Sequence, residues 1–171
     1  MTELGVRMVA EMDDCGILID LAHSNGPCAF DIIEVSEKPV VDSHSNPRAL
    51  VAGDRSAPDA VMRALADKGG MLGIPPPIQR PYRDAPYEGV DGEQLAQTLA
   101  QIRYAVDVMG VEGVGIGTHF NSACMPWVVE GLLDAGFARG RWLRSVVRII
   151  CGYCVQYCPP EGRRRCAIAI W

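Results

Sequence analysis

Residues 15–25 read CGILIDLAHSN, a short run of branched apolar side chains between a glycine and a histidine. Apolar side chains recur at helical spacing through residues 2–14, and Gly16 stands where that helix should end. The segment Ile17–Leu21 is short and apolar throughout, which is typical of a strand buried on both faces. The stretch therefore predicts a helix followed by a buried strand, the unit of parallel α/β sheets.

The same alternation continues along the chain. Further strands are expected at Pro39–Val41, Met71–Ile74 and Gly113–Gly117. Helices are expected at Pro27–Glu37, from an N-cap at Ser56 to Gly69, at Gly92–Met109 and at Pro126–Asp134. The proline-rich residues 75–91 are expected to form a long loop. The fold class is therefore α/β, with about four parallel strands joined by helical crossovers.

Composition limits the classes of protein that remain. The chain has 171 residues, of which 49% are hydrophobic and 22% charged, as expected for one globular domain rather than a disordered chain. Its net charge of -5 and acidic first 138 residues argue against a nucleic-acid surface. No apolar run is long enough for a membrane span, and the acidic start does not resemble a secretory signal. We therefore expect a soluble, cytoplasmic protein.

Each of the three histidines follows a predicted strand: His23, His44 and His119. The carboxyl ends of parallel strands meet at one edge, so these imidazoles are expected to lie together. Imidazole is a zinc ligand, and Asp20 and Asp42 are placed to orient the rings. The alternative is that each histidine only makes loop hydrogen bonds.

At these residues the chain resembles the membrane (renal) dipeptidase family of binuclear zinc peptidases, which fold as a (β/α)8 barrel. The similar segments are LGVRMVAEMDDCGILIDLAHSN, EVSEKPVVDSHSNPRAL, GDRSAPDAVMRALADKGGMLGI and IRYAVDVMGVEGVGIG, in family order over residues 4–137. The resemblance implies part of a TIM-type barrel and zinc-dependent hydrolysis of dipeptides by a metal-activated water.

The resemblance also implies roles for individual residues. His23 and His44 match the two histidines that bind one zinc ion, and Arg55 matches the arginine that holds the carboxylate of the substrate. Where the family has G-S-D-F-D-G, this chain has GTHFNS, with His119 and Asn121 in place of both aspartates. His119 is thus a candidate metal ligand or proton carrier in place of a catalytic aspartate.

The first half of the family pattern has no counterpart in this sequence. The H-x-D ligand pair and the glutamate that bridges two metals are absent, so residues 1–137 match only the second half of a barrel. A fragment with weak or no activity is expected, completed by another copy of the chain or by a separately encoded first half. The alternative function is a noncatalytic half-barrel that serves in binding or assembly.

Residues 138–171 form an Arg- and Cys-rich tail that departs from the family. The motif CGYCVQYCP, with Cys166, partly resembles a site for zinc or an iron-sulfur cluster. Read one nucleotide out of register, however, codons for residues 148–158 can encode the family-like ENYLRVLCSIL, so a frameshift is the preferred explanation. A divergent tail is the third possibility. A helix is plausible at Trp142–Ile150, but the tail is expected to pack poorly, with no evident partner for its apolar end, CAIAIW.

Overall fold

Parallel strands form one sheet in the computed structural model, which describes residues 1–76, 92–117, 125–137 and 168–170. The order across the sheet is β4-β3-β2-β1-β5, and every neighbouring pair is parallel. The strands are β1 (Leu18–Asp20), β2 (Val41–Asp42), β3 (Met71–Ile74), β4 (Val114–Ile116) and β5 (Ile168–Ile170). The four strands of the main body are thus adjacent in chain order.

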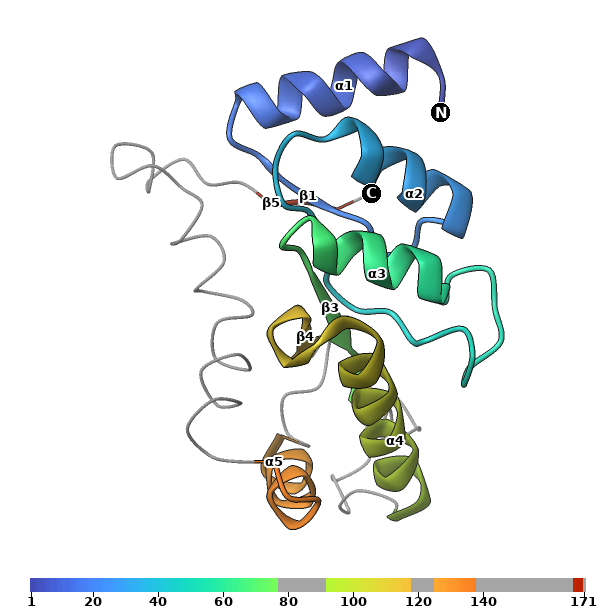
Figure 1. Ribbon diagram of the computed structural model, residues 1–171, viewed down its shortest axis with the longest axis vertical. Coiled ribbons are helices and arrows are strands. Elements are labelled where there is room, and N and C mark those ends of the chain that lie inside the picture. Colours follow the sequence, from blue (N-terminus) through green and yellow to red (C-terminus); the bar gives the residue numbers. More distant parts are fainter. Residues whose placement is uncertain (77–91, 118–124, 138–167, 171) are drawn as a thin grey trace, which may run out of the picture.

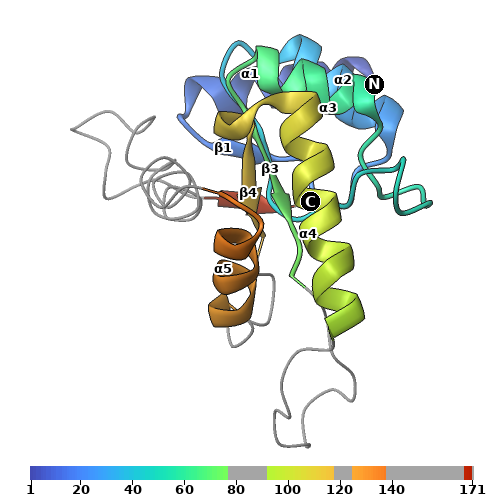
Figure 2. The same cartoon turned by 60° about the horizontal axis from the view of Figure 1, so that its bottom comes forward.

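Helices connect these strands and pack against one another in the same succession (Figure 1). They are α1 (Glu3–Asp14), α2 (Gly26–Val35), α3 (Asp59–Asp67), α4 (Gly92–Met109) and α5 (Met125–Asp134), with a 3-10 turn, η1, at Val111–Gly113. Right-handed crossovers between strands laid down in one direction place successive helices on the same face of a sheet. Figure 2 shows α1, α2 and α3 together above the strands, with α4 beside them. This is the arrangement of a barrel segment rather than of a doubly wound sheet.

The buried core lies between the strands and the helix layer. Its largest fully buried side chains include Ile19 of β1, Leu72 of β3 and Val114 of β4, which form one hydrophobic cluster with Met62 and Leu65 of α3. These positions come from the apolar strand runs and from one face of an amphipathic helix, so the sequence pattern accounts for the core directly.

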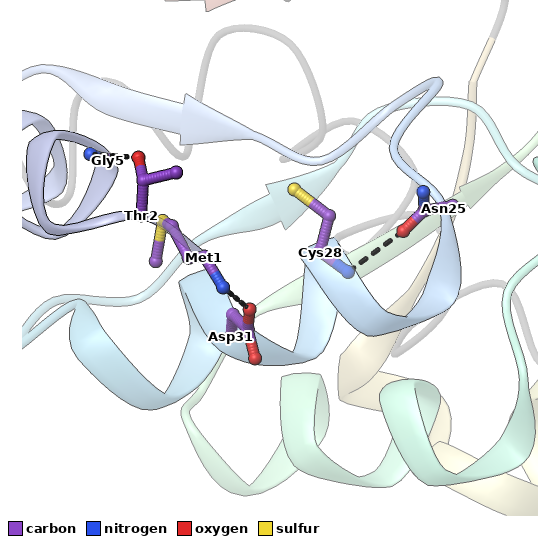
Figure 3. Close-up of polar contacts among 6 residues, drawn as sticks. All are labelled: Met1, Thr2, Gly5, Asn25, Cys28 and Asp31. Carbon is purple, nitrogen blue, oxygen red and sulfur yellow. Dashed lines mark hydrogen bonds and ion pairs between the residues drawn. The ribbon is translucent and has the colours of Figure 1, made fainter.

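The N-terminal residues join α1 to α2 (Figure 3). Thr2 caps α1 by accepting a hydrogen bond from the Gly5 amide at 3.2 Å, and Asn25 caps α2 by accepting one from the Cys28 amide at 3.0 Å. The amino group of Met1 pairs with the Asp31 carboxylate, and this contact raises the pKa of the amino group. The polar contacts at this end are ordinary helix caps and an exposed ion pair.

The start of α3 differs from the sequence prediction. Pro58, not Ser56, is the N-cap, and the helix begins at Asp59. The reason is an isolated parallel bridge between Pro47 and Ala57, in which the Arg48 amide donates to the Ala57 carbonyl at 2.9 Å. This pairing keeps residue 57 extended, so a helix cannot start directly after Ser56.

The apolar end of the tail has a partner, contrary to expectation. Residues Ile168–Ile170 form β5, which pairs with β1 in the register Leu18↔Ile168, Ile19↔Ala169 and Asp20↔Ile170. The expected helix at Trp142–Ile150 and the cysteines from Cys151 to Cys166 lie outside the described residues. The frameshift hypothesis and the metal-binding hypothesis for the tail therefore stay predictions.

Among the residues that the structure describes, every helix is too short or too polar to cross a membrane.

Candidate functional site

Two histidines meet beyond the carboxyl ends of β1 and β2. The Nε2 atoms of His23 and His44 lie 2.9 Å apart, with ring centroids separated by 4.9 Å and planes inclined by 71°. The sequence analysis expected their imidazoles to share one edge of the sheet, and this proximity is confirmed. Their role as metal ligands stays a prediction.

Arg55 joins the same group from the loop that precedes α3. The Nη2 atom of its guanidinium contacts Nδ1 of His23 and lies 3.1 Å from Nε2 of the same ring. Arg55 and His23 are exposed and His44 is partly buried, so the cluster is open to solutes. The structure thus brings together three of the four site residues expected from the sequence.

One assignment of ring protons satisfies the shorter of the two Arg55 contacts and the contact between the two rings. The guanidinium donates to Nδ1 of His23, whose Nε2 then carries a proton and donates to Nε2 of His44. His44 in turn donates from Nδ1 to the Ser43 hydroxyl at 2.7 Å. In this assignment both rings are neutral, which is the form of imidazole that binds metals.

Backbone features hold the two histidines in place. His23 has a φ of 72°, the left-handed conformation that non-glycine residues seldom adopt and that tends to persist at functional sites. The turn that carries His44 packs against two glycines, Gly73 and Gly117. A Cβ on Gly73 would come within 2.2 Å of the Ser43 carbonyl oxygen, and a Cβ on Gly117 would come within 2.1 Å of the same oxygen. Only glycine at both positions lets the turn that carries His44 lie this close to β3 and β4.

Two buried carboxylates support the histidine turns through the main chain. Asp42 accepts a hydrogen bond from the Ser45 hydroxyl at 2.6 Å. Burial is the main reason that its pKa is raised to about 6; hydrogen bonds from Ser45 and from the His44 amide lower the pKa and the nearby charge of Asp20 raises it. Asp20 accepts bonds from backbone amides rather than from a ring nitrogen. Asp20 and Asp42 were expected to orient the imidazole rings, but their hydrogen bonds act on the backbone of the turns instead.

The two imidazole nitrogens meet part of what a zinc site requires. Two ligands of a tetrahedral zinc ion lie about 3.3 Å apart, close to the 2.9 Å observed between the two imidazole nitrogens. A catalytic zinc site takes three protein ligands. Within the described part of the chain, no group of three or more His, Cys, Asp or Glu side chains is assembled for a metal. The histidine pair therefore offers two nitrogen donors, one fewer than such a site takes.

The fourth predicted residue, His119, lies with Asn121 outside the described residues. Conversely, sequence reasoning missed Ser43, Gly73 and Gly117. A signal for the glycines was present, because a glycine inside an apolar strand often marks a close approach of another backbone. No comparable signal identifies Ser43, whose hydroxyl contacts His44, the next residue along the chain.

Comparison with known proteins gives this geometry a context. The family model described as membrane dipeptidase, peptidase family M19, matches residues 1–139. The chain is 26% identical over 147 residues to the dipeptidase aclJ of Aspergillus oryzae, covering 80% of this chain and 34% of that protein. It is 29% identical over 130 residues to the dipeptidase verJ of Clonostachys rogersoniana, covering 76% and 31%.

Solved structures show the same fold. A metallopeptidase from Rhodobacter sphaeroides, bound to a phosphinate mimic of the dipeptide L-Ala-D-Ala, superposes with a TM-score of 0.70 at 23% identity. The match covers 89% of this chain and 45% of that one. The chain thus spans less than half the length of these relatives, and the expected partial, unclosed TIM-type barrel is confirmed.

Proposed function

Because the chain belongs to the membrane dipeptidase family, peptidase family M19, we propose that it provides the half of a zinc-dependent dipeptidase site that binds one metal and the substrate carboxylate. The observation that carries this proposal is the 2.9 Å separation of the His23 and His44 Nε2 atoms, with Arg55 against the first ring. Relatives named dipeptidases and a neighbour bound to a dipeptide mimic support it.

Each side chain has a role in this proposal. His23 and His44 would hold the zinc ion through their Nε2 atoms, which requires the ring proton of His23 to move from Nε2 to Nδ1 so that both imidazoles stay neutral. When bound, zinc polarises the scissile carbonyl and lowers the pKa of a water that attacks it. Arg55 binds the free carboxylate of the dipeptide through two parallel N–H bonds, which orients the peptide bond toward the histidines.

Arg55 has to change partner when substrate binds. In the free chain its guanidinium donates to His23 Nδ1. A substrate carboxylate is a stronger, charged acceptor, so it draws the guanidinium away from the ring. Nδ1 of His23 is then free to carry the ring proton, which leaves its Nε2 available to a metal, so occupancy by a carboxylate and by zinc should favour each other. His119 takes the place of the family aspartate as the group that carries the proton.

The test is direct titration of the purified chain with Zn²⁺. We expect binding in the wild type and its loss in His44→Ala and in His23→Asn. Asparagine is chosen at position 23 because it tolerates the left-handed backbone, whereas alanine would add strain. Arg55→Lys should retain zinc binding but weaken the binding of a dipeptide with a free C-terminal carboxylate, because lysine lacks the planar fork.

A dipeptide amide serves as the matched control ligand, since it lacks the carboxylate that Arg55 should bind. Equal zinc affinity in the wild type and both histidine variants would overturn the metal site. Equal affinity of the wild type for the dipeptide and its amide would overturn the role of Arg55.

A further inference from the structure

Asp20, the last residue of β1, bridges the two turns that carry the histidines. One atom, Oδ1, accepts a hydrogen bond from the Ala22 amide at 3.0 Å and another from the Ser43 amide at 2.9 Å. Ala22 directly precedes His23 and Ser43 directly precedes His44. A single carboxylate oxygen therefore contacts the residue before each histidine.

We propose that Asp20 is the positioning residue that sets the separation of His23 and His44. This inference rests on the proposed function only where it concerns metal binding. The positioning of the two histidines is inferred for the metal-free chain. Asp20 would act through the backbone of both turns, without contacting metal or substrate itself.

The first argument is that, within the described residues, little backbone pairing joins the two turns. β2 has two residues, and its register with β1 is a single pair, Asp20↔Val41, extended by a bond from the Leu21 amide to the Val41 carbonyl at 2.7 Å. The strand pairing thus ends before either histidine is reached. The bond from Ser43 to Asp20 continues the connection past the end of the strands.

The second argument is the backbone of His23. A residue at a φ of 72° keeps that conformation when its surroundings leave no alternative. The Ala22 amide bond to Asp20 closes a turn of the Asx type one residue before His23, and the Ser24 amide bond to the Leu21 carbonyl closes a second at 2.9 Å. Together they hold His23 from both sides.

The third argument is burial. Asp20 is 1% exposed, and its other oxygen, Oδ2, is buried and has no hydrogen-bond partner among the residues that the structure describes. An unsatisfied buried carboxylate oxygen is unfavourable for folding, and such groups in native proteins usually have a functional reason. The bridge provides that reason, since a shorter side chain cannot reach both amides.

The experiment compares four variants of the full chain by Zn²⁺ titration, by urea unfolding without metal, and by NMR contacts between the two imidazoles without metal. Asp20→Ala should weaken zinc binding about 10- to 100-fold, the usual effect of losing a group that orients a ligand. Asp20→Asn should stay within about threefold of the wild type, because an amide oxygen accepts both backbone bonds. The serine side chain of Asp20→Ser is too short to reach the Ser43 amide, so this variant should bind zinc as weakly as Asp20→Ala. It replaces Asp20→Ala in the comparison if the alanine variant does not fold.

Asp13→Ala is the matched control. Asp13 is also a buried carboxylate that joins two segments, since it accepts bonds from the Glu37 amide at 2.7 Å and from the Ser36 hydroxyl at 3.0 Å, but it lies at the other end of the strands. Its loss should lower stability and leave zinc affinity unchanged. A wild-type zinc affinity in folded Asp20→Ala or Asp20→Ser would overturn the inference, as would a loss of affinity in Asp20→Asn equal to that in alanine.

The metal-free NMR readout separates this inference from the proposed function. Imidazole contacts that disappear in Asp20→Ser but persist in Asp13→Ala support positioning even where the wild type binds no zinc. In that case only the metal site would be rejected. Contacts that persist in Asp20→Ser would reject positioning, whatever the zinc titration shows.

Discussion

Gly117, the residue after β4, lies directly against His44: a Cβ built on it would come within 2.9 Å of the His44 Cβ and 3.0 Å of its Cα. β2 and β4 are not neighbours in the sheet, because β3 lies between them. The turn after β2 therefore crosses over β3 and reaches the end of β4. This crossing places a metal-ligand candidate above the centre of the strand ends, as in the mouth of a barrel.

Substituting this glycine should displace His44. Gly117→Ala forces the Ser43 carbonyl or the His44 backbone to move, and we expect a loss of about 1–3 kcal/mol in the free energy of unfolding, together with weaker zinc binding. Denaturant unfolding and zinc titration measure the two effects. Gly53→Ala is the control, since its Cβ would meet only the Ser56 hydroxyl oxygen, at an ordinary 3.6 Å. Unchanged stability and zinc affinity in Gly117→Ala would contradict the packing described.

The isolated chain should hydrolyse dipeptides weakly or not at all, even with added zinc. The sequence has no counterpart of the family's H-x-D pair or bridging glutamate, and His119 stands where the family has an aspartate. Loss of a proton carrier alone commonly lowers the rate about 10²- to 10⁴-fold. Hydrolysis of L-Ala-D-Ala, followed by release of free alanine, checks this. Rapid zinc-dependent turnover that disappears in His23→Asn would show that the expectation is wrong.

Tyr104 of α4 should titrate at unusually high pH. Its hydroxyl donates to both Asp59 carboxylate oxygens, at 2.9 and 2.8 Å, and this bond is the main reason that its pKa is raised above 10.0. The folded chain thus holds the proton more tightly than the unfolded chain. The stabilising effect is complete below the ordinary tyrosine pKa and is lost as pH rises through the higher pKa of the folded state.

Absorbance of the phenolate, recorded against pH for the wild type and Tyr104→Phe, isolates this residue from the other tyrosines. Asp59→Asn is the second variant, because an amide removes the negative charge but leaves an acceptor for the hydroxyl. The pKa of Tyr104 should lie closer to the ordinary tyrosine value in Asp59→Asn than in the wild type. A normal titration of Tyr104 in the wild type would contradict the contact between α3 and α4.

Sequence reasoning reached most of the fold because the strands are buried on both faces and the helices have one apolar face. It placed α4 at Gly92–Met109, as the structure does, and it expected His23 and His44 together because parallel strands end at one edge. It misplaced the start of α3 because the bridge between Pro47 and Ala57 joins distant residues.

The details of the site depend on contacts that a linear pattern does not contain. The bridge from Asp20 to the Ser43 amide links residues 23 positions apart, and the sequence suggested only that an aspartate would orient a ring. The pairing of β5 with β1 was missed for a similar reason. A three-residue apolar strand is too short to identify from periodicity, and its partner is chosen by an unpaired edge in the folded sheet.

That pairing leads to the final prediction. Removal of residues 168–171 leaves the outer edge of β1 unpaired, and we expect a loss on the order of 2 kcal/mol in stability, since each ladder hydrogen bond contributes about 1 kcal/mol net. The exposed edge should also promote self-association, because an unpaired strand is a template for another chain. Denaturant unfolding and analytical ultracentrifugation measure the two effects. Deletion of Trp171 alone is the control, because β5 ends at Ile170. A truncated chain as stable and monomeric as this control would mean that β5 does not protect the edge.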